Sequence, residues 1–285
     1  MRRSFVVLAG CALLLGPLAA RPAPGAEPDP LRVDVLSKGS SSLLGIRKAK
    51  QAVPVDSMPG GWQTRVGQVL KNLSIYRKLP DIRCETDPRV VSYFLDNPEV
   101  AVGIWRALGV SNVSMVRTGP YTFRADDGQG SRGDLSVVYR DAGQQVIFCD
   151  GVFVNPVSGK PIQAKAVIHF RHRPERSADG RVFSRHDATM FVSLPSNTVE
   201  AVARAISPVS NRLADRNFQE VSLFIRMMNV AMTEQPAWVR DLSSRLTDVR
   251  PTERASLVAL TDTLSADPAP GGRVQTAGRG GPVVR

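Results

Sequence analysis

The sequence predicts an α+β fold in which one antiparallel sheet packs against a long helix near the C-terminus. Between residues 113 and 194, short segments of alternating apolar and polar residues follow one another, separated by turn sequences. Two short helical patterns precede them at 87–95 and 97–108, and a longer one with a broad apolar face follows at 211–232. Strands with one apolar and one polar face are typical of an antiparallel sheet that is covered on one side.

Length and composition exclude several classes of protein. The chain has 285 residues, of which 42% are hydrophobic, so it can bury a core. Three cysteines are too few for a disulfide-dense scaffold or a cysteine-based zinc module. The net charge of +11 suggests an anionic partner, but the basic residues are scattered and only 6% of residues are aromatic, which argues against a base-stacking surface. We therefore expect no nucleic-acid partner.

The first 26 residues are typical of a secretory signal peptide. Arg2 and Arg3 precede an uncharged run at 5–20, and a stretch rich in small residues and proline follows at 21–26. The apolar run is shorter than the roughly 20 residues needed to span a bilayer. We expect cleavage after Ala26 and export from a bacterial cell, to the periplasm or the exterior, by the general or the twin-arginine route. An uncleaved N-terminal anchor is the alternative.

Two segments are expected between the signal peptide and the main domain. Residues 27–60 are predicted to be a linker, because proline, glycine and serine punctuate them without sustained periodicity. Residues 61–79 are predicted to be an amphipathic helix with basic residues beside its apolar stripe. Such a helix either packs on a neighbouring domain or lies on an anionic membrane.

Residues 80–235 are expected to form one α+β domain. The strand at 162–172 alternates well, and so does the last strand, at 182–194. The helix at 211–232 has too broad an apolar face to stand in water, so it must be buried against the sheet. Two further helices are expected within 236–265. The last residues, 266–285, are expected to be a disordered tail because of their glycine, proline and arginine content.

One block of sequence resembles a known superfamily. It begins the second short helix and reads Asp96-Asn97-Pro98-Glu99-Val100-Ala101-Val102-Gly103-Ile104-Trp105. With the hairpins and the long helix that follow, it resembles the START-like (SRPBCC) superfamily of polyketide cyclases and lipid-transfer proteins, over about half the chain. It is also similar to uncharacterised secreted bacterial proteins. The START-like resemblance implies a helix-grip fold, in which a curved antiparallel sheet grips the long C-terminal helix, with extra N- and C-terminal helices here.

The helix-grip resemblance implies an apolar cavity between the sheet and the long helix. Six apolar residues of the two longest strands and the long helix would line it as ligand-binding residues: Ile168, Phe170, Met190, Val192, Phe224 and Met228. Methionine at such a place adapts its shape to different ligands. The alternative is that these six residues fill an ordinary solid core.

The sequence offers little catalytic chemistry. It contains no nucleophile elbow, phosphate loop, zinc-protease helix or dinucleotide fingerprint, so we expect no cofactor, no metal and no catalytic residue. Alternation places His169 and His172 on opposite faces of one strand. His172 and His186 are the polar candidates for a site inside the cavity, and a metal site formed by these two with Asp187 is an alternative. Cys84 and Cys149 either form one disulfide after export or remain two buried thiols.

We therefore expect an exported, non-catalytic binding module for a lipid or another hydrophobic small molecule. The first alternative is an enzyme of cyclase or hydrolase type on the same fold. The second is an envelope-associated protein that contacts an anionic membrane or envelope polymer through its basic helix and tail.

Overall fold

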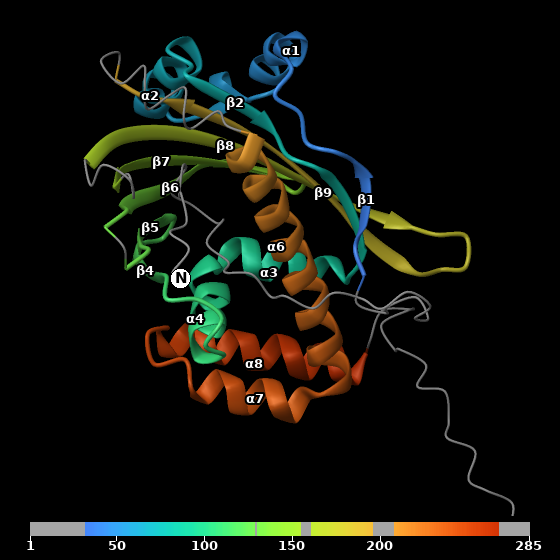
Figure 1. Cartoon of the computed structure of the whole chain (residues 1–285). Coiled ribbons are helices and arrows are strands. Elements are labelled where there is room, and N and C mark those ends of the chain that lie inside the picture. The colour runs from blue at the N-terminus through green and yellow to red at the C-terminus, as the bar shows by residue number, and fades with distance from the viewer. Residues whose placement is uncertain (1–31, 129, 155–160, 196–207, 268–285) are drawn as a thin grey trace, which may run out of the picture.

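The computed structural model describes residues 32–128, 130–154, 161–195 and 208–267 (Figure 1). The expected signal peptide at 1–26 lies outside the described residues, and so does 268–285 of the expected tail. The strands form one antiparallel sheet in the order β1-β3-β9-β8-β7-β6-β5-β4, with β2 also pairing with β9. Their bounds are β1 Asp34–Ser37, β2 Ile75–Lys78, β3 Asp81–Glu85, β4 Ser114–Gly119, β5 Thr122–Asp126, β6 Arg132–Arg140, β7 Gln144–Val154, β8 Pro161–Arg176 and β9 Val182–Ser193.

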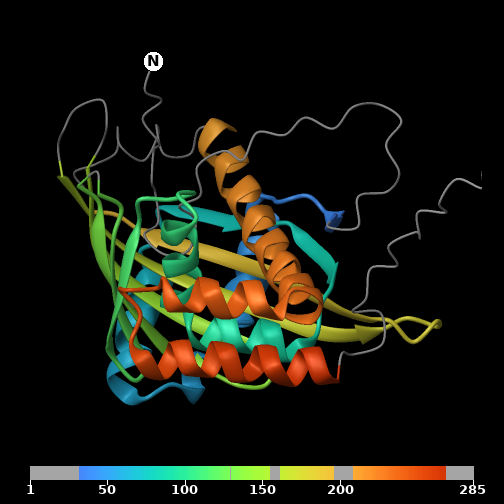
Figure 2. The same cartoon turned by 90° about the horizontal axis from the view of Figure 1, so that it is seen from below.

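The helices lie on both sides of the sheet. Their bounds are η1 Leu43–Gly45, α1 Ile46–Gln51, η2 Val55–Ser57, α2 Gly60–Lys71, α3 Pro88–Asp96, α4 Pro98–Ala107, α6 Pro208–Glu234, α7 Pro236–Ser244 and α8 Pro251–Ala266. The curved sheet holds α3, α4 and the long α6 on one side, with α7 and α8 beyond them, while α1 and α2 lie on the other (Figures 1 and 2). This is the predicted helix-grip architecture. No helix in the described part of the chain is long and apolar enough to cross a membrane.

The sheet buries apolar residues on both faces, and successive residues of a strand belong to opposite faces. On β8, Ile168 belongs to the large cluster that includes α6, whereas its neighbour Val167 belongs to a smaller cluster that includes α2. We call these the inner and outer clusters, and the corresponding sides of the sheet its inner and outer faces. Because side chains alternate along a strand, β2 and β6 to β9 contribute to both layers.

The N-terminal segment differs from expectation. Residues 34–57, predicted as linker, contain β1, η1, α1 and η2, and β1 pairs with β3 at the edge of the sheet. The helix predicted at 61–79 ends at Lys71, and Ile75–Lys78 is the strand β2, which pairs with β9. The difference has a tertiary cause. A short run of apolar residues fits the periodicity of a strand as well as that of a helix, and here the backbone of β9 supplies hydrogen bonds that the end of a helix would leave unmade.

The α2 stripe is buried on the outer face rather than presented to a membrane. Val66, Val69 and Leu70 belong to the outer cluster together with Phe148 and Phe191 of the sheet. Of the two readings of this amphipathic helix, the structure therefore supports packing on the neighbouring domain.

The two short inner helices begin at different kinds of cap. Both start with proline at the first helical position, as predicted. The Asp87 carboxylate accepts the backbone N–H of Arg89 at 2.8 Å and so caps α3. Asn97 precedes α4 but its side chain makes no cap hydrogen bond; its Nδ2 donates to Tyr93 O and its Oδ1 accepts from Arg117.

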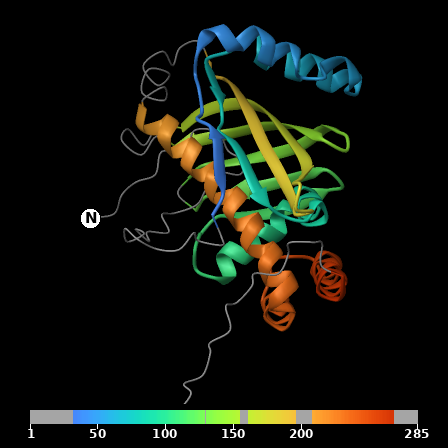
Figure 3. The ribbon, with the colours of Figure 1, turned by 90° about the vertical axis from the view of Figure 1, so that its right-hand side faces the viewer.

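A line of polar side chains fixes α6 against one edge of the sheet. Asp215, Ser222, Arg226 and Asn229 recur at intervals of seven, four and three residues, so they share one face of the helix. We call this line the polar seam. Arg77 of β2 donates to both Asp215 carboxylate oxygens, at 3.0 and 2.5 Å, and Asn229 Oδ1 accepts the Asp87 backbone N–H at 2.9 Å. The seam joins α6 to β2 and to the start of α3. Figure 3 shows the long α6, in orange, running diagonally across the molecule.

Candidate ligand site on the inner face of the sheet

The structure gathers the six predicted cavity residues in one place. Ile168, Met190, Val192, Phe224 and Met228 are buried members of the inner cluster, and Phe170 packs against it while only partly buried. Residue register explains the proximity on the sheet, because Ile168 of β8 is directly opposite Met190 of β9. Phe224 also contacts Phe94 and Trp105 edge-on, with ring centroids 5.1 and 5.3 Å away. Much of the predicted set is thus packed core.

The inner face is incompletely covered at β6, β7 and β8. Val137, Ile147 and Phe170 are apolar residues of three adjacent strands, all on the inner face, and all remain only partly buried. Val137 is opposite Ile147, and Phe170 is opposite Gln145. On α6, Ala214 and Val221 are also only partly buried against the same cluster. These half-buried residues form apolar surface that a ligand could cover.

A pocket of about 310 Å³ adjoins this surface. We call it the inner pocket. It lies between the junction of α3 and α4 and the inner face of β4 to β7, and its walls are Leu95, Asp96, Asn97, Arg117, Pro120, Tyr121, Phe123, Val137, Arg140 and Gln145. Val137 belongs both to the pocket wall and to the half-buried apolar row, so the two are continuous. The volume is within the range of about 300–1,000 Å³ that small-molecule sites occupy.

The charges of the inner pocket are already paired within the protein. Arg117 Nε donates to Glu99 Oε1 at 2.6 Å, and its Nη2 reaches Glu99 Oε2 at 3.1 Å and the Asp96 carbonyl at 2.5 Å. Arg140 forms an ion pair with the Asp96 carboxylate. Two arginines are therefore matched by two carboxylates, and the pocket does not present a free charge to a ligand.

The side-chain amide of Gln145 is a hydrogen-bonding group of the inner pocket that the described residues do not use. Its side chain is only 3% exposed and lines the pocket, and no residue in the described part of the chain hydrogen-bonds its amide. An amide in the wall of a pocket that makes no hydrogen bond to these residues can both donate to and accept from an occupant.

The two candidate histidines lie together on the inner face. His172 of β8 is directly opposite His186 of β9, and both are buried. The His186 ring contacts the hydroxyls of Ser184, at 2.8 Å, and Ser222, at 3.3 Å; burial lowers the pKa of His186 to about 3. Burial also lowers the pKa of His172. Both imidazoles are therefore neutral near pH 7.

His169 lies on the other face of β8, as predicted. Its Nε2 is 2.7 Å from Gln144 Oε1, and burial lowers its pKa to about 4. Asp187 also lies on the outer face, where it pairs with Arg171 at 2.9 Å, so it cannot complete a metal site with His172 and His186. No cluster of possible metal ligands occurs among the described residues.

Both candidate cysteines are buried, and no disulfide joins Cys84 to Cys149. Cys84 is on β3 and Cys149 on β7, with β9 and β8 between them. Three strand spacings separate them by at least about 14 Å, and the register also offsets them along the strands, far beyond the reach of a disulfide. Burial raises the pKa of the Cys84 thiol to about 11.

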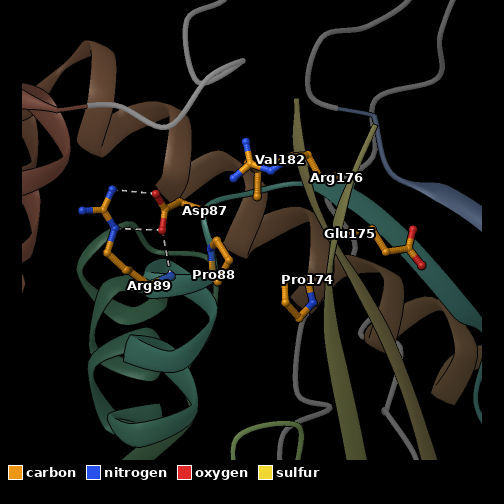
Figure 4. A pocket seen from close by; sticks show the side chains of 7 residues that line it. All are labelled: Asp87, Pro88, Arg89, Pro174, Glu175, Arg176 and Val182. Atoms are coloured by element: carbon orange, nitrogen blue, oxygen red, sulfur yellow. Dashed lines mark hydrogen bonds and ion pairs between the residues drawn. The ribbon is translucent and has the colours of Figure 1, made fainter. Parts of the chain in front are cut away.

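A second pocket, of about 390 Å³, lies between the start of α3 and the β8–β9 hairpin (Figure 4). Asp87, Pro88 and Arg89 form one wall, and Pro174, Glu175, Arg176 and Val182 form the other. The Asp87 carboxylate is occupied by Arg89 at 3.0 and 2.7 Å, and Glu175 by Arg83 at 3.2 Å. None of the six predicted residues lines this pocket or the inner pocket; of the two, the inner pocket adjoins the half-buried apolar row of the sheet through Val137.

Gln145 and the residues around Arg117 were missed by the sequence reasoning. A signal for Gln145 existed: in the predicted strand at 145–154 it has the same phase as Ile147 and Cys149, which marks a polar residue on the apolar face. Nothing local pointed to Arg117, because its partner Glu99 comes from a separate helix.

No protein-family model matches the chain, and no curated protein matches it in sequence. Solved structures that align with it include a conserved protein from Geobacillus kaustophilus, with 16% identity and a TM-score of 0.36 over 52% of this chain and 90% of that one. Truncated norcoclaurine synthase from Thalictrum flavum aligns with 10% identity and a TM-score of 0.30, over 52% and 92% of the two chains. Ara h 8.0201 aligns with 10% identity and a TM-score of 0.29, over 52% and 98%. Alignments at this level assign no activity to this chain.

Proposed function

We propose that this protein is an exported, non-catalytic binding protein for a small hydrophobic molecule that carries one neutral polar group. The observation that supports it best is the position of Gln145. Its unpartnered amide lies in the wall of the inner pocket, beside the half-buried apolar residues Val137 and Phe170. A concave apolar site with one or two polar anchors is typical of small-molecule recognition.

The pairing of charges in the pocket argues for a neutral polar group on the ligand. Arg117 and Arg140 are each held by a carboxylate, so an anionic ligand would have to displace Glu99 or Asp96. The Arg117–Glu99 pair is buried, so breaking it would leave an uncompensated charge and is strongly unfavourable. A hydroxyl, amide or amine that bonds with Gln145 meets no such cost.

A fluorescence titration tests the proposal. The probe is N-phenyl-1-naphthylamine, which is neutral and apolar and carries one N–H. We expect the parent protein to bind it, and Ile147→Trp, which fills the apolar surface next to the pocket, to bind it at least about tenfold more weakly. Gln145→Leu should weaken binding by about fivefold, the effect of one net hydrogen bond.

Val116→Trp is the matched control, because Val116 is an exposed residue of the edge strand β4. It should bind the probe as the parent does. Equal affinity of the parent and Ile147→Trp, or no binding by the parent, would contradict the proposal.

An enzyme remains the second candidate because of His172. Its imidazole is buried on the inner face, is neutral near pH 7 because burial lowers its pKa, and has no hydrogen-bond partner in the described part of the chain. A neutral imidazole of this kind is a possible general base. Mass spectrometry of small molecules extracted from the parent and from His172→Ala distinguishes the two functions: the same mass supports binding alone, and a precursor found only with the variant supports turnover.

A further inference from the structure

Two adjacent leucines project from the surface at the N-terminal end of the outer layer. Leu43 is 80% exposed and Leu44 is 95% exposed, and both belong to the single turn η1. We call residues 43–45 the leucine turn. Single exposed apolar residues are common on protein surfaces, but two neighbouring leucines that are both this exposed form a small continuous apolar patch.

The leucine turn is held rigidly by its neighbours. Before it, Ser40 and Lys78 exchange two backbone hydrogen bonds of 2.8 Å, and Arg77 Nη1 donates to Ser41 Oγ at 3.2 Å. After it, Ile46 and Ala49 of α1 pack against the outer cluster. The leucines are therefore presented to solvent by a folded support, and the apolar residues of α1 that point inward are already used.

Basic residues flank the leucine turn in the sequence. Residues 38–55 contain Lys38, Arg47, Lys48 and Lys50 and no acidic residue. Lys38, Arg47 and Lys48 are exposed, and none of the four forms an ion pair with an acid in the described part of the chain. The electrostatic potential around Leu43 and Leu44 is therefore positive.

We propose that the leucine turn docks on an anionic lipid bilayer, with Leu43 and Leu44 in the boundary between head groups and acyl chains and the four cations at the lipid phosphates. An apolar tip within a basic rim matches that surface on both counts. A second copy of the chain would bring the same cations face to face, and the net charge of +11 opposes it further. The inference does not rest on the ligand site, which lies on the opposite face of the sheet.

Depth-dependent fluorescence quenching tests the docking locally. The full chain is prepared as Leu44→Trp and, as matched control, as Leu108→Trp, since Leu108 is 44% exposed at the end of α4. Both are mixed with vesicles of brominated phosphatidylcholine and phosphatidylglycerol. We expect quenching of the tryptophan at 44 and none of the tryptophan at 108. The quenching of the parent chain, which measures the background from Trp62, Trp105 and Trp238, is subtracted from that of each variant. The difference is insensitive to membrane contact made by residues 1–31, because these residues contain no tryptophan.

The charge requirement is tested by reversal. Arg47→Glu with Lys48→Glu, added to Leu44→Trp, should reduce vesicle affinity by at least about tenfold. Lys71→Glu with Arg132→Glu, two exposed cations elsewhere, should leave the quenching unchanged. The proposal is overturned if the tryptophan at 44 is not quenched, if 44 and 108 are quenched equally, or if vesicles without phosphatidylglycerol quench the tryptophan at 44 just as well.

Discussion

The ion pair between Arg117 and Glu99 closes one side of the inner pocket and holds three elements together. Glu99 is at the start of α4, Arg117 is on β4, and the same guanidinium also bonds to the Asp96 carbonyl at the end of α3. Both side chains are almost fully buried. Pocket shape and helix position therefore depend on the same two charges.

Glu99→Gln keeps the size of the side chain and removes its charge. We expect it to lower the free energy of unfolding by about 3 kcal/mol, because the guanidinium of Arg117 stays buried with only the more distant Glu253 carboxylate, at 4.0 Å, as a counter-charge. Urea unfolding followed by circular dichroism measures the change.

The control is Asp134→Asn, which breaks an ion pair with Arg124 of similar length, 2.8 Å, whose two side chains are largely exposed. It should cost less than about 1 kcal/mol. Equal losses for the two variants would show that burial does not set the strength of the Arg117 pair.

Single residues also show which features of the fold the sequence could predict and which it could not. The starts of α3 and α4 follow from proline and from the residues before it, and both were predicted. That Asp87 caps its helix while Asn97 bonds to Arg117 could not be predicted, because the choice depends on an arginine about twenty residues further along the chain.

Among the elements, α6 shows what periodicity can and cannot reveal. The broad apolar face of the helix predicts its burial, and the structure confirms it. The polar seam is equally periodic, yet sequence alone does not distinguish a buried polar stripe from a solvated one. The partners of the seam come from β2 and the start of α3, far away in the chain.

The Arg77–Asp215 contact of the seam makes Gly39 a sensitive position. A Cβ at residue 39 would overlap the Asp215 carboxylate and lie 2.7 Å from Arg77 Nη2. We expect Gly39→Ala to separate the pair and to destabilise the protein by about 2 kcal/mol, within the usual range for disrupting a buried network.

Gly67→Ala is the control for that substitution. Gly67 is inside α2 and a Cβ there meets nothing within 4 Å. Alanine favours the helix by about 0.5–1 kcal/mol over glycine, so this variant should be more stable than the parent. Thermal unfolding of the two variants should shift in opposite directions, and a parallel shift would contradict the steric explanation.

At the level of the whole molecule, the inner and outer clusters pack on opposite faces of one sheet, and each face has a buried, neutral histidine. His186 is buried on the inner face with a pKa of about 3, and His169 on the outer face with a pKa of about 4. Both values are below the ordinary histidine pKa of about 6.5 that the unfolded chain has. The unfolded state therefore binds more protons than the folded state between pH 6.5 and 4.

The contribution of these histidines to stability should accordingly be constant above about pH 7 and fall as the pH is lowered through 6.5 towards 4. Each buried neutral histidine contributes about 1 kcal/mol per pH unit in that window. His186→Gln, which can keep a hydrogen bond to Ser184, should fall less steeply than the parent. Urea unfolding at a series of pH values measures both slopes, and identical slopes would show that His186 does not titrate on unfolding.

The strand order has a consequence for the order of events in folding. β2 and β3 are early in the chain, yet both pair with β9, and the contact of Asp81 with Arg185 spans 104 residues. During synthesis from the N-terminus, these strands have no β9 to join until residues 182–193 have been made. Sequence-distant pairing of this kind slows folding to milliseconds or longer. The sheet therefore cannot close around α3 and α4 until β9 has left the ribosome, well after those two helices have been made.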